Sequence, residues 1–313
     1  MSNWQFKPVA FKFQLSSYMT LFKLSLPLQI RGDKLVNETV PVALPVVPSD
    51  ELVPGSQGFV IRGLPLSAPL PMLSRNGDYL CYAQEHYHHF HIDFSIGYEQ
   101  YKNKFSSKTR STLNRKLRKY AEHCGGTIPW KAYRTPEEIR EFFALARDLS
   151  KTTYQDRVLG VGLPDNEAFI ENALKLAEAD RLRAFILFDG ARPVSYLYCP
   201  VDAGVLTFAY LGYDPEYLHL SVGIVLQWLA TEQLFAENRF RFFDFTEGEG
   251  DHKRLFATHQ RLCCHLVLVK RSLRNSAIIR AHILMNQVTG EIGDLMEKHG
   301  VKARVKRMIK RRR

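Results

Sequence analysis

Residues 181–271 carry the pattern that most restricts the fold of this chain. They hold three strands joined by tight turns, then one apolar helix, then two more strands. The turns at Asp189-Gly190 and Asp202-Ala203-Gly204 are typical of hairpins. The helix is expected from about Leu220 to Glu237, and the strand "FRFFDF" follows it. A helix between strands that otherwise form hairpins predicts an α/β (α+β) fold, in which helices flank a mixed, mostly antiparallel sheet.

Three helices are expected ahead of these strands, and the third buries Phe169, Ala173, Leu174 and Ala177. The first begins at Ser106 or Ser107, because serine caps helices, and stops at Gly125-Gly126. The second opens with a capping box formed by Thr135 and Glu138. The outer surface of the first helix is basic and is either a solvated face or one that meets phosphates: Lys108, Arg115, Arg118 and Lys119.

The first 95 residues favour short strands and turns over long helices. Seven prolines between residues 41 and 71 disfavour long helices there. "DYLCYAQ" and "HFHIDFS" have the composition of two strands. The histidine run from His86 to His91 resembles a metal cluster, but no cysteine or acidic residue lies at ligand spacing beside it. We therefore expect a histidine-rich strand and no metal.

Composition predicts a globular protein with a basic end. The 313 residues are 45% hydrophobic and 24% charged, and no apolar run approaches the length of a membrane helix. Five cysteines without a C-x-x-C pair favour a reducing compartment, so a cytoplasmic location is expected. Eight of the net eleven positive charges come from the last 13 residues, which leaves +3 for the other 300. This basic tail is either a solvated end or an arm that finds anionic surfaces.

The first stretch suited to chemistry is the start of the apolar helix. Ser221, Val222 and Gly223 open it, followed by Ile224 and Val225. Helix N-termini bind phosphates through free backbone N–H groups and the positive end of the dipole. Gly223 has no side chain to keep an anion from the backbone. The alternative is an ordinary helix cap.

The second stretch is "DFTEGEGDHKRLF", residues 244–256. It follows a strand, and its carboxylates would repel phosphate, while the Gly-Lys-Ser/Thr of a P-loop is missing. We expect a polar turn that positions an acid and a base, with Asp251 capping a short helix that reaches Thr258. The candidate catalytic residues are Asp244, Glu247, His252 and Lys253.

The third stretch is the loop "SKTTYQDRVLGVGLP" between two helices. Tyr154, Gln155 and Arg157 can line a substrate pocket there. The alternative is a surface connector.

Several short motifs, in this order, resemble the GCN5-related N-acetyltransferase (GNAT) superfamily. The chain is most similar to the branch of cellulose-biosynthesis (CelD- and BcsL-like) acetyltransferases, which is related to FemAB-type transferases. A basic helix motif, a "Y-x-P-x-Y" strand end with a small-residue helix start, and "F-D-F" with "Y-K-x-x-F" carry the resemblance. The matching residues are Ser107, Lys108, Arg110, Leu113 and Arg115; Tyr213, Pro215, Tyr217, Ser221 and Gly223; Phe243, Asp244, Phe245, Lys253 and Phe256.

The resemblance implies transfer of an acyl group, usually acetyl, from acyl-coenzyme A to a primary amine. In the superfamily the pyrophosphate of the donor binds the start of the helix after the fourth strand, here residues 221–225. Tyr213, Tyr154 and Gln155 are then candidates for substrate contacts. The amine attacks the thioester directly, so one group must take a proton from the amine and one must protonate the thiolate. An amino sugar or polysaccharide precursor is the implied acceptor.

Two departures from the family pattern leave alternatives open. His252 stands where relatives have tyrosine, and histidine can serve as acid or base near neutral pH. Of the family's phosphate-loop signature only Gly223 is present. FemAB-type relatives use aminoacyl-tRNA, which the basic helix and tail would suit. A non-catalytic protein that binds nucleic acid or an anionic membrane through its tail is the third alternative.

The resemblance also implies a division of the chain. Residues 1–98 would form a degenerate GNAT-like half, residues 99–272 the acyltransferase domain, and residues 273–313 a helical segment with the basic tail. The fold expected is therefore two GNAT-like halves.

Overall fold

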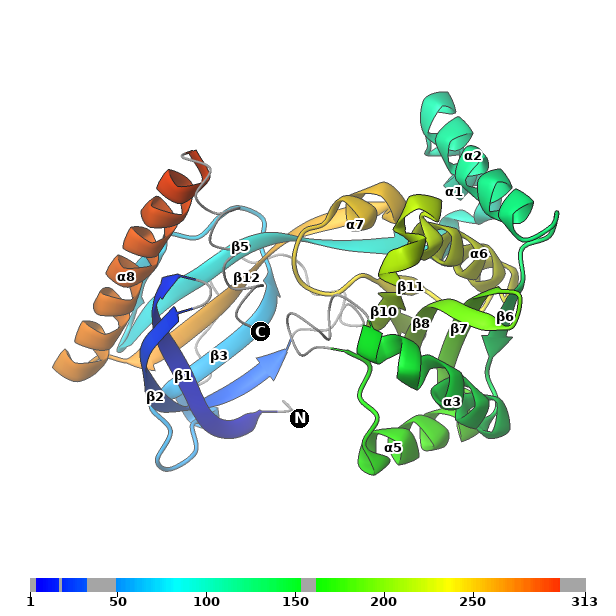
Figure 1. The fold of residues 1–313 in the computed structure, drawn as a ribbon. Coiled ribbons are helices and arrows are strands. Elements are labelled where there is room, and N and C mark those ends of the chain that lie inside the picture. The colour runs from blue at the N-terminus through cyan, green and yellow to red at the C-terminus, as the bar shows by residue number, and fades with distance from the viewer. Residues whose placement is uncertain (1–3, 17–18, 33–48, 153–161, 299–313) are drawn as a thin grey trace. The chain divides into compact units, whose positions relative to one another are not determined.

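The computed structural model describes residues 4–16, 19–32, 49–152 and 162–298 (Figure 1). The basic tail from residue 299 onward lies outside these ranges. The chain forms two compact units, each described here by itself. The described residues up to His86 and those from Leu262 onward belong to the first unit, and Tyr87–Arg261 belongs to the second.

The first unit is a curved sheet with one long helix. Its strands follow the order β1-β2-β3-β12-β5, with β4 paired to β5. The helix α8 contributes to the same apolar cluster as the strands β1, β2, β3, β5 and β12. The elements are β1 (Gln5–Ser16), β2 (Met19–Gly32), a 3-10 turn (Ser49–Glu51), β3 (Gly58–Pro65), β4 (Leu73–Asn76), β5 (Tyr79–Asp93), β12 (His259–Lys270) and α8 (Leu273–Lys298).

The strands of this unit are longer than the sequence predicts. β1 has 12 residues and β2 has 14, so the expectation of short strands is wrong. Both strands contain a proline, and Pro8 and Pro27 stand opposite each other in the antiparallel pair. The two strands expected around the histidine run are one 15-residue strand, β5, which begins in the first unit and ends in the second. The helix expected after Ser272 is present as α8.

The second unit contains the elements that position the site. Its helices are α1 (Tyr98–Asn103), α2 (Ser107–His123), α3 (Pro136–Thr152), α5 (Glu167–Glu178), α6 (Val222–Ala236) and α7 (Asp251–Phe256). Its strands are β6 (Trp130–Tyr133), β7 (Leu182–Asp189), β8 (Arg192–Asp202), β9 (Val205–Thr207), β10 (Tyr210–Tyr213) and β11 (Phe242–Asp244), with 3-10 turns at Phe94–Ile96 and Pro215–Leu220.

Helices cover both faces of this sheet. The strand order is β5-β11-β9-β8-β7-β6, with β10 also paired to β8. Alternate β7 residues face opposite clusters, because side chains alternate along a strand. Phe185 and Leu187 pack in the cluster that contains α2 and α6, while Ala184 and Ile186 pack in the cluster that contains α3 and α5. Figure 1 shows these two helix pairs on either side of the sheet.

The expected hairpins and helix caps are confirmed. β7–β8 and β8–β9 are antiparallel and join at the predicted turns, whereas β9 and β11 are parallel. The Ser106 side chain accepts from the Thr109 amide, and Glu138 accepts from the amide of Thr135 while its own amide donates to the Thr135 hydroxyl. The predicted mixed, mostly antiparallel α/β fold is therefore confirmed.

One predicted cap is wrong. The cap of α7 is Gly250, and Asp251 is already the first helical residue. The helix ends at Phe256, two residues before the predicted end. Extended Gly250 takes the cap position without a side-chain hydrogen bond, so the acid of Asp251 acts only as a favourable charge in the first turn.

Two further observations bear on composition. None of the five cysteines, all within the described residues, forms a disulfide. Within the described ranges, none of the helices is both long enough and apolar enough to cross a lipid bilayer.

Candidate active site

The candidate site begins where two parallel strands separate. β9 pairs with β11 as far as Asp244. The Phe208 amide then donates to the Asp244 carbonyl at 2.8 Å, while the Ala209 amide donates to the Tyr198 carbonyl on β8 at 3.2 Å. From there the chain continues as β10, which pairs with β8 only. Among the described strands, β10 therefore has a partner on one edge and none on the other.

A cavity of about 590 Å³ lies at this separation. This volume is within the range of small-molecule and cofactor sites. Its wall comes from β10, the start of α6, the end of β11 and the start of α7. The lining residues are Phe208, Ala209, Tyr210, Leu211, Tyr213, Leu218, Ser221, Val222, Gly223, Ile224, Gln227, Phe245, Thr246, His252 and Lys253.

The predicted phosphate site opens on this cavity. Ser221 adopts a left-handed conformation (φ 57°) before α6, and its side chain makes no capping hydrogen bond. The first amides of a helix have no acceptor within the helix, so this end presents N–H groups and the positive end of the dipole. Four of the five predicted residues, Ser221 to Ile224, line the cavity. Val225 does not line it and is buried in the core below.

Gly223 has a packing role beside the one predicted for it. A Cβ atom there would lie 3.3 Å from Cδ1 of Tyr213 and 3.5 Å from Cδ2 of Leu211. The missing side chain therefore allows α6 to pack closely against β10. Tyr213, a predicted substrate contact, forms part of the cavity wall.

Gln227 supplies a buried donor that the sequence analysis did not select. It lies in the second turn of α6, lines the cavity and is only 1% exposed. Its Nε2 atom has no hydrogen-bond partner in the part of the chain that the structure describes. Because buried polar groups are almost always hydrogen-bonded, this atom points to a ligand with an acceptor.

His252 is a predicted proton-transfer residue that lines the cavity. Its imidazole ring makes no hydrogen bond within the described structure. The ring lies against Phe208, with centroids 5.9 Å apart. Burial, together with the charge of Lys253, lowers the pKa of His252 below its usual 6.5, and Asp251 opposes this only in part. The imidazole is therefore neutral at pH 7 and able to accept a proton.

Lys253 also lines the cavity, but its ammonium group holds the turn that follows β11. Nζ donates to the carbonyls of Glu247 at 2.6 Å, Gly248 at 3.2 Å and Thr246 at 3.4 Å. Burial lowers the pKa of Lys253, while the charges of Asp244 and Glu247 raise it. The contacts give Lys253 a positioning role for the turn.

Thr246 connects the cavity to the acid on the other side of the strand. It is a β-branched residue at φ 61°, a strained conformation that concentrates at functional sites. Its amide donates to Oδ1 of Asp244 at 2.7 Å. Thr246 itself lines the cavity.

The two predicted carboxylates lie outside the cavity wall. Asp244 accepts from Nε2 of His89 at 2.5 Å. Burial opposes ionisation of Asp244, but the hydrogen bonds from His89 and Thr246 and the charge of Arg261 leave its pKa below the usual value. Glu247 is exposed in the turn that Lys253 holds.

The predicted substrate-pocket residues Tyr154, Gln155 and Arg157 lie outside the described residues. No group of three histidine, cysteine or acidic side chains is arranged to hold a metal ion in the described ranges. The basic surface of α2 is exposed at Lys108, Arg115, Arg118 and Lys119, and Nζ of Lys119 donates to the carbonyl of His219 just before α6.

The structure therefore brings together Ser221 to Ile224, Tyr213, His252 and Lys253, which the sequence placed in two separate stretches.

Residues 107–254 match the family described as an acetyltransferase (GNAT) domain, Acetyltransf_6. The matched range, residues 107–254, contains every residue of the cavity wall. Membership of the cellulose-biosynthesis branch stays a prediction. A search of curated proteins found none that matches the chain.

Solved structures give weaker similarities. The C-terminal domain (DUF2156) of a protein assigned as a lysylphosphatidylglycerol synthetase from Agrobacterium fabrum is 10% identical, with a TM-score of 0.48 over 75% of this chain and 73% of that chain. L-PGS from Bacillus licheniformis is 14% identical, with a TM-score of 0.43 over 71% of each chain. FemX is 10% identical, with a TM-score of 0.42 over 58% of this chain and 61% of that chain.

Proposed function

We propose that this protein is an N-acyltransferase that moves an acyl group, most simply acetyl, from acyl-coenzyme A to a primary amine. The observation that carries the proposal is the single cavity into which the start of α6, the free edge of β10 and His252 all open. The match of residues 107–254 to an acetyltransferase domain supports it.

Each wall of the cavity suits one part of the donor. The amides at the start of α6 suit the pyrophosphate. The edge of β10 that lacks a strand partner in the described sheet offers backbone groups to the amide-containing arm of coenzyme A. The buried Nε2 of Gln227 is a further donor for a carbonyl on this arm. Titration calorimetry of the purified protein with acetyl-CoA tests this directly, and absence of binding would refute the donor assignment.

The reaction needs no covalent intermediate on the protein. The amine nitrogen attacks the thioester carbonyl, a C–N bond forms, and the C–S bond breaks. We propose that neutral His252 takes the proton released by the amine and returns a proton to the departing thiolate, so the products are an amide and free thiol. Lys253 holds the adjoining turn in place. Asp244 and Glu247 lie outside the cavity wall, and His252 makes both proton transfers in this scheme.

The Gln227→Leu variant tests the donor-binding role of the buried amide. We expect affinity for acetyl-CoA to fall about tenfold, the value of one lost hydrogen bond. Because a buried donor without a partner costs stability, the melting temperature should stay the same or rise. Calorimetry and thermal unfolding measure the two effects. A lower melting temperature with unchanged affinity would show instead that Gln227 serves the fold.

The His252→Gln variant tests the proton-transfer role. We expect kcat to fall about 100-fold, within the range that general acid–base catalysis supplies. Since burial lowers the pKa of His252, the neutral base persists below pH 6.5. The acid limb of kcat in the wild-type protein should therefore lie below pH 6.5 and be absent in the variant.

His219→Gln is the matched control for this experiment. His219 is exposed, belongs to the 3-10 turn before α6 and does not line the cavity. We expect its kcat and pH profile to match the wild type. Full activity in His252→Gln would exclude the proton-transfer role of His252.

We propose that the acceptor is a primary amine. Amino sugars and polysaccharide precursors are the first class to test. Mass spectrometry of an amine pool incubated with the protein and acyl-CoAs would identify it by the added acyl mass. If amino sugars stay unmodified while another amine gains the acyl group, the class of that amine replaces amino sugars as the proposed acceptor.

A second donor, aminoacyl-tRNA, is favoured by one observation. The exposed basic side chains of α2 form no ion pairs in the described structure, and they suit a phosphate backbone: Lys108, Arg110, Arg115, Arg118 and Lys119. Salt-dependent RNA retention that survives removal of residues 301–313 would favour this donor. If RNA retention is lost when residues 301–313 are removed, the RNA binding belongs to the basic tail.

A further inference from the structure

One face of three neighbouring strands in the second unit is polar. His89 and His91 lie on β5, Asp244 on β11 opposite His91, and His259 and Arg261 at the start of β12. We call these five residues the polar strand face. Side chains between them point the other way, because they alternate along a strand. Phe90, Ile92 and Phe243 accordingly belong to the apolar core that contains α6.

The polar strand face is held together by close contacts. Nε2 of His89 lies 2.5 Å from Oδ1 of Asp244. The rings of His91 and His259 are stacked with centroids 5.6 Å apart. Burial lowers the pKa of His91 to about 4, helped by the charges of His259, His89 and Arg261. These residues are therefore close enough to act on one ligand.

Four buried atoms of this face lack a hydrogen-bond partner anywhere in the described part of the chain. They are Nδ1 of His89, Nδ1 of His91, and Nε and Nη2 of Arg261. His89 is only 5% exposed. Since each such atom costs stability, four in one place indicate a site built for a ligand.

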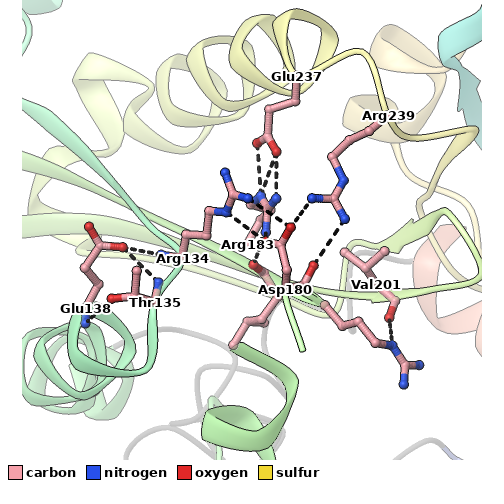
Figure 2. Close-up of polar contacts among 10 residues, drawn as sticks. Arg134, Thr135, Glu138, Asp180, Arg183, Val201, Glu237 and Arg239 are labelled. Atoms are coloured by element: carbon pink, nitrogen blue, oxygen red, sulfur yellow. Dashed lines mark hydrogen bonds and ion pairs between the residues drawn. The ribbon is translucent and has the colours of Figure 1, made fainter. Parts of the chain in front are cut away.

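The two free atoms of Arg261 form one edge of its guanidinium group. Two other arginines of this unit show what that edge binds (Figure 2). Arg134 donates from Nε and Nη2 to the two carboxylate oxygens of Asp180, at 2.7 and 2.9 Å. Arg183 presents the same edge to Glu237. Arg261 therefore offers a fork that fits a carboxylate or phosphate.

His89 offers the opposite kind of group. The ionised carboxylate of Asp244 can only accept, so the proton of the shared hydrogen bond lies on Nε2 of His89. In the neutral ring Nδ1 then carries a lone pair and can accept from an amine. A ligand that bears both an amine and an acidic group would satisfy His89 and Arg261 together.

The polar strand face adjoins the proposed donor cavity at the end of β11. Asp244 belongs to the face, and Thr246, two residues further on, lines the cavity. The Thr246 amide donates to the Asp244 carboxylate, so the two regions share a hydrogen bond. An amine held by His89 would therefore lie beside the strand end at which the cavity opens.

We propose that the polar strand face is the acceptor site and that the acceptor is an amine carrying a carboxylate or phosphate group, which the Arg261 fork binds. This inference rests on the proposed acyltransferase function and narrows its acceptor class. Hydrogen bonds from His89 and the Thr246 amide stabilise the charge of Asp244, and the positive charge of Arg261 nearby opposes it.

The test uses three small amines with the same two-carbon spacing. Ethanolamine has no acidic group, β-alanine has a carboxylate and phosphoethanolamine has a phosphate. Binding to the full-length protein is measured by titration without any acyl donor. We expect one of the two acids to bind at least about tenfold more tightly than ethanolamine, and the one preferred identifies the group. Equal binding of all three would overturn the proposal.

Arg261 variants show whether the preference comes from the fork. Arg261→Gln should abolish it, and Arg261→Lys should lose most of it because lysine keeps the charge but not the paired donors. Arg140→Gln is the control: Arg140 is exposed on α3, and among the described residues its ion pair is a 3.7 Å contact with Glu137. The preference should survive there. Survival in Arg261→Gln, or a fall in its melting temperature that indicates a structural arginine, would overturn the proposal.

Acyl transfer separates this inference from the proposed function. An Arg261-dependent preference for an acid without any transfer would support the acceptor site and contradict the acyltransferase. Transfer to ethanolamine as efficient as transfer to both acids would support the acyltransferase and contradict the acceptor site.

Discussion

Replacing Ser221 by aspartate should weaken binding of acetyl-CoA about 100-fold. The side chain would place a carboxylate at the start of α6, in the wall of the cavity. There it would compete with the pyrophosphate for the same amides and repel it, and like charges in contact cost several kcal/mol. Aspartate tolerates the left-handed conformation of Ser221, so the fold should not suffer.

Ser221→Asn is the matched control, because asparagine has the shape of aspartate without its charge and adopts the same backbone conformation readily. Its affinity should stay within about threefold of wild type, a free-energy difference below 1 kcal/mol. Titration calorimetry gives both affinities, and thermal unfolding checks that both variants fold. Equal affinities for the two variants would show that no anion binds at this helix start.

Local signals account for the parts of the site that could be predicted. The turns between β7, β8 and β9, the caps at Ser106 and Thr135, and the start of α6 are each encoded within a few residues. For that reason the sequence predicts both the stretch around Ser221 and the stretch around His252. Their meeting in one cavity follows from the separation of β10 from β11, which is a property of the sheet.

The missed residues depend on distant partners. His89 and Asp244 are 155 positions apart, and no spacing in the sequence links them. Gln227 lies within an otherwise apolar helix, and its role follows from which side of α6 faces the cavity. The sequence predicts two strands in place of β5 because the histidines interrupt the apolar pattern of a strand, whereas in the structure they form its polar side.

Replacing Arg183 by methionine should lower the free energy of unfolding by about 3–5 kcal/mol, the cost of breaking a buried ion pair at one partner. Arg183 is 1% exposed, and Nε and Nη2 donate to the carboxylate of Glu237 at 2.7–3.0 Å (Figure 2). Nη1 donates to Asp180 at 2.8 Å and to the carbonyl of Leu182 at 2.7 Å. The variant would leave Glu237 without its partner.

Two further variants test this reason. Arg239→Met removes an exposed arginine that also binds Asp180, and exposed pairs contribute only about 0–1 kcal/mol. The double variant Arg183→Met with Glu237→Leu should be more stable than Arg183→Met alone, because it leaves no uncompensated buried charge. Urea unfolding at pH 7 measures all three.

The position of this ion pair links stability to the proposed site. Glu237 directly follows α6, and the start of the same helix forms the donor end of the cavity. Arg183 on β7 therefore fixes the far end of the helix that must present its amides to the ligand. Arg183→Met should weaken acetyl-CoA binding as well as stability, whereas Arg239→Met should change neither appreciably. A stable Arg183→Met variant, within about 1 kcal/mol of wild type, would contradict the anchoring role.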